Sequence, residues 1–227
     1  MEERLATDDS EVIMVDWQPP PSQETKAPST GYAVWYSAAQ RLIKHDIPTS
    51  IKAKDANKLQ HHVNDAISCL ECILNGTHPF PTEPSIANVL LPPRFEVITR
   101  YHIANLLITY TNSLETADAH LQKAILILGQ SPIPHSLDLI FCIKSLQITI
   151  FERRDVLKAA KKMLKDMSLD AHTSERMDLW YLSQLKSAEI ASLMNDVKQS
   201  RTLLTGGALE AQKRGDLDMQ ACNSLII

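Results

Sequence analysis

The chain has 227 residues, 44% of them hydrophobic and 22% charged, and carries a formal net charge of −4 at neutral pH. This composition is typical of a globular protein with its own core and excludes an intrinsically disordered chain. No apolar run approaches the roughly 18 residues that span a membrane, and residues 1–9 lack the basic and apolar regions of a secretory signal.

Residues 1–30 are acidic and proline-rich, and we expect them to form a flexible tail. Seven acidic and two basic side chains give this segment a net charge of −5, so the rest of the chain carries +1. Three consecutive prolines at 19–21 favour extended, solvated backbone. The apolar run at residues 12–17 is a candidate interaction motif, although a partly ordered tail that rests on its own domain explains it equally well.

Residues 31–227 are predicted to form a helical-repeat domain. The chain contains only 6 glycines, and no proline follows Pro134, which favours helices over β-rich or α/β folds. A proline-rich insertion at 77–93 is expected to interrupt the helices once. The spacing of apolar residues predicts helices over residues 31–45, 55–75, 94–112, 114–130, 136–152, 155–168, 175–194, 196–214 and 216–227.

A small residue followed four positions later by a large one recurs in alternate predicted helices. A helix pair that recurs about every 41 residues is typical of an α-solenoid, so the predicted fold is all-α, with antiparallel helix pairs stacked into a tetratricopeptide-like superhelix. The last predicted helix ends in apolar residues, where a terminal solenoid helix normally turns a polar face outward. We therefore expect the chain to end within a longer array. The recurring pairs are Ala66 and Leu70, Ala117 and Leu121, Ala159 and Met163, and Ser200 and Leu204.

The chain carries none of the sequence motifs of nucleotide-binding or hydrolytic sites, so we expect no enzyme, no cofactor and no metal centre. Cys69 and Cys72 lie in an apolar helical stripe, with His61 and His62 one to two turns before them. Structural zinc needs four ligands, and no second cysteine pair lies nearby. Buried thiols in a reducing compartment, the cytosol or the nucleus, are the favoured interpretation.

Four lysines, Lys158, Lys161, Lys162 and Lys165, share one face of the helix expected at 155–168. A basic stripe of this kind can meet the phosphates of DNA or an acidic protein. A solvated outer face of a solenoid helix explains the same pattern more simply.

Four segments carry a more specific pattern: residues 31–42, 69–72, 92–107 and 111–124. They resemble the opening repeats of the small, tetratricopeptide-like subunit of the cohesin loader, the Mau-2 type chromatid cohesion factors, most sharply over 92–128. The resemblance implies a non-enzymatic scaffold, associated with chromatin in the nucleus, that supports cohesin loading for sister-chromatid cohesion. It further implies a superhelix that wraps the extended N-terminal segment of the larger, HEAT-repeat loader subunit, with no small-molecule substrate and no membrane contact.

A superhelix of helix pairs has a groove lined by the first helix of each pair. We assign Ile98, His102, Asn105 and Thr109 on the helix expected at 94–112 to this groove, with Tyr36 as an aromatic shelf. It remains equally open that these polar groups cap neighbouring helices or face solvent. Two other functions stay open for the whole protein: a generic tetratricopeptide-like adaptor in another large complex, and a direct DNA-binding helical module.

Overall fold

The structure, a computed structural model, describes residues 30–76, 91–130, 133 and 136–216, and the statements below refer to these residues. Most of the predicted tail and insertion, and the helix expected from residue 216, lie outside them. The described residues form α-helices and one π-helical turn with no strand among them, which confirms the all-α prediction.

Helices follow one another along the described chain, and several successive ones are joined by connections of three residues. Their bounds agree with the predicted ranges to within a few residues, and α7 runs five residues beyond its predicted end. The elements are α1 (Thr30–Arg41), η1 (Leu42–Asp46), α2 (Ile47–Lys52), α3 (Ala56–Leu74), α4 (Pro93–Tyr110), α5 (Leu114–Gln130), α6 (Ser136–Arg153), α7 (Leu157–Thr173), α8 (Met177–Leu193) and α9 (Val197–Arg214).

The first predicted helix, expected to end at residue 45, continues to Lys52 through the π-helical turn η1. Ile47 donates its backbone N–H to the carbonyl of Leu42, five residues back. Pro48 stands in the first turn of α2 and has no N–H to donate, so the wider turn falls where a regular helical hydrogen bond is missing. The segments α1, η1 and α2 therefore act together as one long first helix.

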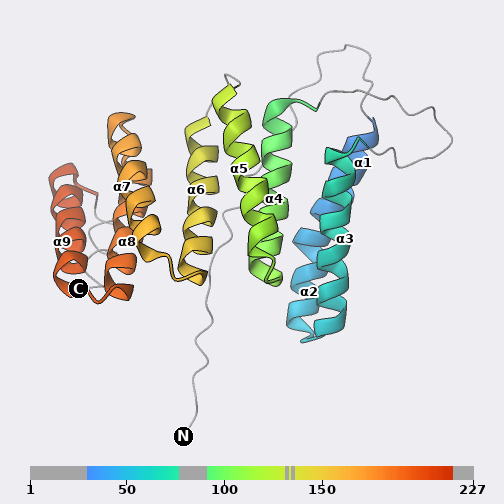
Figure 1. Cartoon of the computed structure of the whole chain (residues 1–227), viewed down its shortest axis with the longest axis horizontal. Coiled ribbons are helices and arrows are strands. Elements are labelled where there is room, and N and C mark those ends of the chain that lie inside the picture. Colours follow the sequence, from blue (N-terminus) through green and yellow to red (C-terminus); the bar gives the residue numbers. More distant parts are fainter. Residues whose placement is uncertain (1–29, 77–90, 131–132, 134–135, 217–227) are drawn as a thin grey trace, which may run out of the picture.

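The helices stack as antiparallel pairs in a row (Figure 1). The long first helix pairs with α3, and the pairs α4–α5, α6–α7 and α8–α9 follow, each touching the next through α3–α4, α5–α6 and α7–α8 contacts. This arrangement confirms the predicted solenoid. We call α1, α2, α4, α6 and α8 the first-helix layer, and α3, α5, α7 and α9 the second-helix layer.

The second-helix layer buries the predicted stripe of small and large residues, with one correction. In α7 the buried residues are Ala160 and Leu164, which follow Ala117 and Leu121 by 43 residues. The predicted stripe of α7, Ala159 and Met163, was therefore wrong by one position. The predicted and the observed residues have the same helical spacing, and only the turn before α7 sets which of them face the core. The fully covered stripes are Ala66, Leu70 and Ile73 in α3, Ala117, Leu121 and Ala124 in α5, Ala160, Leu164 and Met167 in α7, and Leu204, Gly207 and Ala211 in α9.

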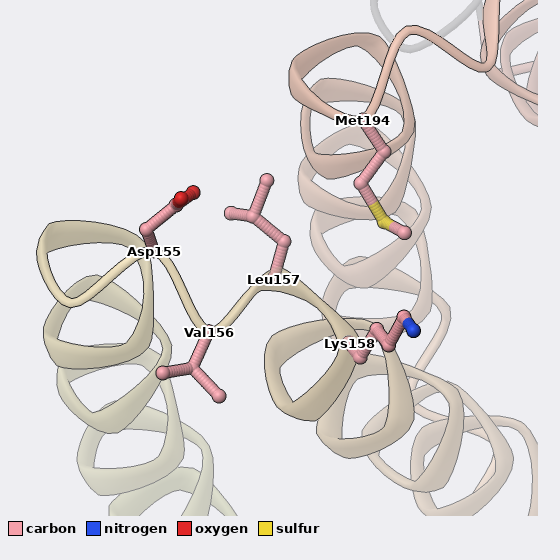
Figure 2. A pocket seen from close by; sticks show the side chains of 5 residues that line it. All are labelled: Asp155, Val156, Leu157, Lys158 and Met194. Atoms are coloured by element: carbon pink, nitrogen blue, oxygen red, sulfur yellow. The ribbon is translucent and has the colours of Figure 1, made fainter.

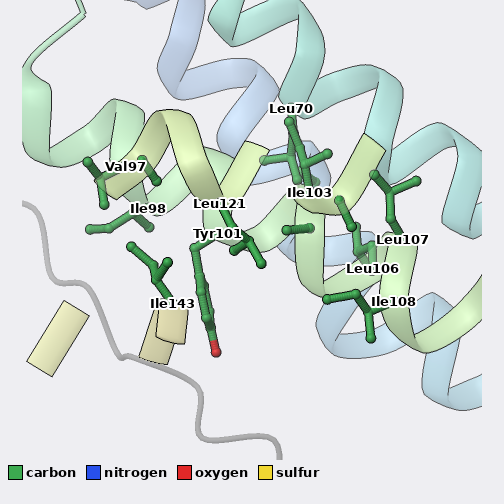
Figure 3. Packing of buried hydrophobic residues seen from close by; sticks show 14 of the residues in the cluster. Leu70, Val97, Ile98, Tyr101, Ile103, Leu106, Leu107, Ile108, Leu121 and Ile143 are labelled. Atoms are coloured by element: carbon green, nitrogen blue, oxygen red, sulfur yellow. The ribbon is translucent and has the colours of Figure 1, made fainter. Parts of the chain in front are cut away.

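The buried apolar residues form two clusters that meet along α6. The larger cluster surrounds α4, which is buried on almost every side by its neighbours (Figure 3). Ile143 and Ile150 of α6 belong to this cluster, whereas Phe141 and Ile148 belong to the second cluster with α7 and α8. Opposite sides of α6 thus complete two different cores, and removing α6 would expose both.

Six described helices end in a tight turn with a left-handed residue, found at Lys54, Gly76, Asp155, Glu175, Asn195 and Gly215. The last four recur every 20 residues, which sets a 40-residue period for the pairs at this end of the chain. In the turn after α8, Asn195 and Asp196 donate their backbone N–H groups to the carbonyls of Ser192 and Ala191, the pattern of a Schellman cap. Two of the six positions carry glycine, and the other four hold side chains in a strained conformation.

We predict that Glu175→Gly stabilises the protein, because Glu175 has a φ of 57° and is exposed. Relief of left-handed strain should raise the free energy of unfolding by about 1 kcal/mol and the Tm by about 2–4 °C. Asn195→Gly should gain less, since asparagine tolerates this conformation better. Thermal unfolding followed by circular dichroism measures both, with Lys162→Gly inside α7 as a control that lowers the Tm. Destabilisation by Glu175→Gly would contradict the turn geometry.

Candidate functional site

The first-helix layer is held together by contacts between helices of successive pairs. At the start of the row, the Tyr36 ring of α1 lies 5.1 Å from the Phe95 ring of α4, measured between centroids. Arg153, at the end of α6, donates from Nη1 to the carbonyl oxygen of Ile108 near the end of α4. The guanidinium satisfies a carbonyl at a helix C-terminus, where positive charge is favoured.

Two ion pairs connect α6 to α8 in the same layer. Arg176 Nη1 lies 2.7 Å from Asp138 Oδ1, and Lys186 Nζ lies 2.9 Å from Glu152 Oε1. Arg176 also pairs with Asp178, and these two carboxylates raise the pKa of its guanidinium. Arg176 and Lys186 are therefore both paired with carboxylates, so these two cations add little net charge to the lining.

The groove residues predicted on α4 separate into a buried and an accessible half. Ile98 is 1% exposed and His102 is 5% exposed, so both side chains belong to the core instead of an open surface. Asn105 is half-buried and Thr109 is exposed, and Thr109 Oγ1 donates to Asn105 Oδ1 at 3.3 Å. The stripe emerges only at the end of α4, because aromatic rings of α1 lie against Phe95 and His102 in its first half.

Tyr36 is the aromatic residue that covers this first half. Its ring lies 6.4 Å from the ring of His102, and its hydroxyl accepts a hydrogen bond from Gln40 Nε2 at 3.1 Å. Burial raises the pKa of Tyr36. Tyr36 remains half-buried, and its role as an aromatic shelf stays a prediction.

The accessible surface continues onto α6 and α8 at positions that the sequence analysis missed. Ser145 and Thr149 stand 43 residues after His102 and Leu106, the spacing that relates α5 to α7. Leu182 and Glu189 of α8 lie on a similar side of their helix, and Leu182 is 51% exposed. Carrying His102 forward by this spacing leads to Ser145, whereas Thr149, Leu182 and Glu189 do not follow from the predicted groove positions. We call Asn105, Thr109, Ser145, Thr149, Leu182 and Glu189 the first-helix face.

His102 is the most perturbed titratable group beside this face. Burial, with a smaller effect from Lys44, lowers the pKa of its imidazole to about 4, so the ring is neutral near pH 7. Its Nε2 has no hydrogen-bond partner among the described residues. The rings of Tyr36 and Tyr101 lie beside the imidazole. This buried environment keeps the imidazole neutral.

The predicted basic stripe lies on α7, in the second-helix layer. Lys158, Lys162 and Lys165 are exposed, and Lys161 donates from Nζ to Gln199 Oε1 of α9. None of the four lysines forms an ion pair with another described residue. The structure therefore separates the stripe from the first-helix face by placing them on different layers.

The described residues contain no group of three or more histidine, cysteine, aspartate or glutamate side chains that could hold a metal ion. Cys69 and Cys72 are half-buried free thiols, and burial raises the pKa of Cys69. A raised pKa makes a thiol less reactive, because the thiolate is the nucleophile and the metal ligand. Among the helices described here, none is long and apolar enough to cross a membrane.

Comparisons with known proteins give one match. The model of the family described as cohesin loading factor matches residues 38–226, which includes the end of α1 and every helix from α2 to α9. No curated protein and no solved structure matches the chain.

We predict that His102 makes the protein less stable in mild acid. An imidazole with a pKa of about 4 when folded and about 6.5 when unfolded binds more protons in the unfolded state between these values. Stability should therefore fall by about 2 kcal/mol between pH 7 and pH 5 from this group alone. Urea unfolding at both pH values should show a smaller pH effect in His102→Gln than in the unaltered chain. His45→Gln, at an exposed position of η1, is the control and should keep the full pH effect.

Proposed function

The chain belongs to the cohesin loading factor family, and we propose that it is a non-catalytic scaffold of the cohesin loader whose first-helix face binds an extended segment of the larger, HEAT-repeat subunit. Family membership by itself implies a role in cohesin loading, within the loader complex and at chromatin in the nucleus. It also confirms the resemblance found in the sequence. The scaffold role, the partner segment and the face that binds it are the proposal.

The observation that carries the proposal is the continuous first-helix layer, linked from α1 to α8 by ring contacts, a helix-end hydrogen bond and two ion pairs. An extended peptide needs hydrogen-bonding groups at intervals along its backbone and apolar pockets for some of its side chains. The Asn105 amide offers both donors and an acceptor, and the hydroxyls of Ser145 and Thr149 stand on the next helix. Leu182 adds an exposed apolar contact on α8.

The lining also suits a peptide electrostatically. Lys186 and Arg176 are held by carboxylates of α6 and α8, so a partner's backbone would not have to displace an unpaired charge. Among the described residues, His102 is the deeply buried imidazole, and it is neutral, with no hydrogen-bond partner there for its Nε2. Both features support binding over catalysis.

A generic adaptor would have the same fold as the proposed loader scaffold and would bind a different partner. Exposed polar and apolar side chains on a helical layer fit many peptides, so the partner's identity depends on the family match. Recovery of the intact partner from cells distinguishes the two functions.

We predict that Ser145→Arg combined with Thr109→Arg lowers co-purification of the large HEAT-repeat loader subunit at least 10-fold. Both positions are exposed, so the added side chains should obstruct the first-helix face without disturbing the core. The matched control is Thr116→Arg with Ala119→Arg, two exposed positions of α5 in the other layer. Affinity purification from nuclear extract, with circular dichroism to verify folding, provides the measurement.

Equal loss with the control pair would place the contact elsewhere on the chain. If the unaltered chain recovers a different complex and no large loader subunit, the adaptor function replaces the proposal.

A further inference from the structure

A second surface, in the second-helix layer, combines unpaired basic side chains with exposed apolar ones. Carried forward by the 40-residue period, Lys158 and Lys161 of α7 correspond to Lys198 and Arg201 of α9. The hydrogen bond from Lys161 to Gln199 shows that the basic side of α7 borders α9. We call Lys158, Lys162, Lys165, Val197, Lys198 and Arg201 the basic–apolar face.

This face is hollowed at two places. A cavity of about 360 Å³ lies at the start of α7, where Leu157 stands between Asp155 and Met194 and Lys158 lies at the rim (Figure 2). A larger hollow of about 710 Å³ runs along α9 and is lined by Val197, Lys198, Arg201 and Leu209, among others. Val197 and Leu209 are both more than half exposed. Apolar walls beside cationic side chains suit a ligand that carries both apolar groups and negative charge.

The two layers differ in how their cations are neutralised. Lys144, Arg176 and Lys186 in the first-helix layer all pair with carboxylates of neighbouring helices. The cations of the basic–apolar face form no ion pair with a described residue. Asp196, the nearest acid on α9, is already engaged as the helix cap and accepts from the backbone N–H of Gln199. The face is therefore left with an excess of positive charge.

We propose that residues 8–17 of this same chain dock on the basic–apolar face. This segment has the complementary chemistry: Asp8, Asp9, Glu11 and Asp16 supply four negative charges around four consecutive apolar residues, and Trp17 follows. It belongs to a tail with a net charge of −5, while the remainder of the chain carries +1. Residues 8–17 and the basic–apolar face therefore have opposite charges, and each also contains apolar side chains that can pack against those of the other.

The chain between this segment and α1 is long enough for the docking. Twelve residues separate Trp17 from Thr30, and an extended chain of that length reaches about 40 Å. Packed helices lie about 8–10 Å apart, and three such steps, from α1 to α4, to α6 and to α7, connect the two ends, so α7 lies within that reach.

An acidic peptide explains the face better than DNA does. Phosphates gain from the lysines but not from Val197, Leu209 and Met194, which stand among them. An acidic segment with apolar residues uses both kinds of side chain. The proposal concerns a different layer from the one that we assign to the partner subunit, so either can fail without the other.

The test uses the intact chain with the photo-crosslinking amino acid benzoylphenylalanine in place of Trp17. Mass spectrometry should locate intramolecular crosslinks within residues 156–169 and 194–209, at a yield independent of protein concentration. The triple variant Lys158→Glu, Lys162→Glu, Lys165→Glu should lower that yield at least 10-fold. A control triple variant with the same charge change at exposed positions elsewhere, Lys52→Glu, Arg94→Glu and Lys123→Glu, should leave it within 2-fold.

Three results would overturn the proposal. Crosslinks that fall outside both segments, or that depend equally on the control triple variant, would show no docking at this face. A yield that rises with concentration would identify the occupant as the tail of a second copy. If crosslinks are lacking and a 20-base-pair DNA duplex binds the unaltered chain but not the Lys158, Lys162, Lys165 variant, the face is a nucleic-acid surface.

Discussion

The structure depends on a single constraint: no helix pair in it can bury its own apolar surface. Each second helix covers its stripe of small and large residues against its own first helix and the next one, and α6 divides its sides between two cores. The small residues at Ala117, Ala160 and Gly207 allow this close stacking, because a larger side chain would separate the helices. Stability is consequently a property of neighbouring pairs and not of any one of them.

This constraint also decides which residues remain free to bind a partner. A helix in the middle of the larger core, such as α4, has neighbours on nearly every side, and even polar positions such as Thr99 and His102 are covered. On α6 and α8 of the same layer, Ser145 and Leu182 reach the surface. The accessible face is thus displaced from the most apolar helix toward the later pairs, and a partner's contacts would be expected to concentrate there.

Sequence reasoning was most successful where the signal is local. Apolar spacing and the prolines located the helices to within a few residues, since both act within one or two turns of the chain. Sequence reasoning failed for the orientation of α7. The turn that fixes this orientation has a left-handed residue at Asp155, where the sequence has no glycine to indicate such a turn. Sequence reasoning also failed for Ile98 and His102, because a helix that is apolar all round gives no sign of which side a neighbour will cover. The 43-residue spacing applied to His102 leads to Ser145, which shows that part of the missing information was present in the sequence.

The division of charge between the layers follows from the same stacking. First helices of successive pairs run parallel, which brings Asp138 beside Arg176 and Glu152 beside Lys186. In the second-helix layer, Lys161 of α7 contacts the neutral Gln199 of α9, which cannot cancel its charge. Lys198 and Arg201 of α9 add to the positive charge of α7. A surface with little net charge can bind an extended backbone at little electrostatic cost. A positively charged and hollowed surface instead favours ligands that carry negative charge. One solenoid can therefore present two surfaces of different specificity, provided that the cations that pair with carboxylates of neighbouring helices lie on the first-helix layer.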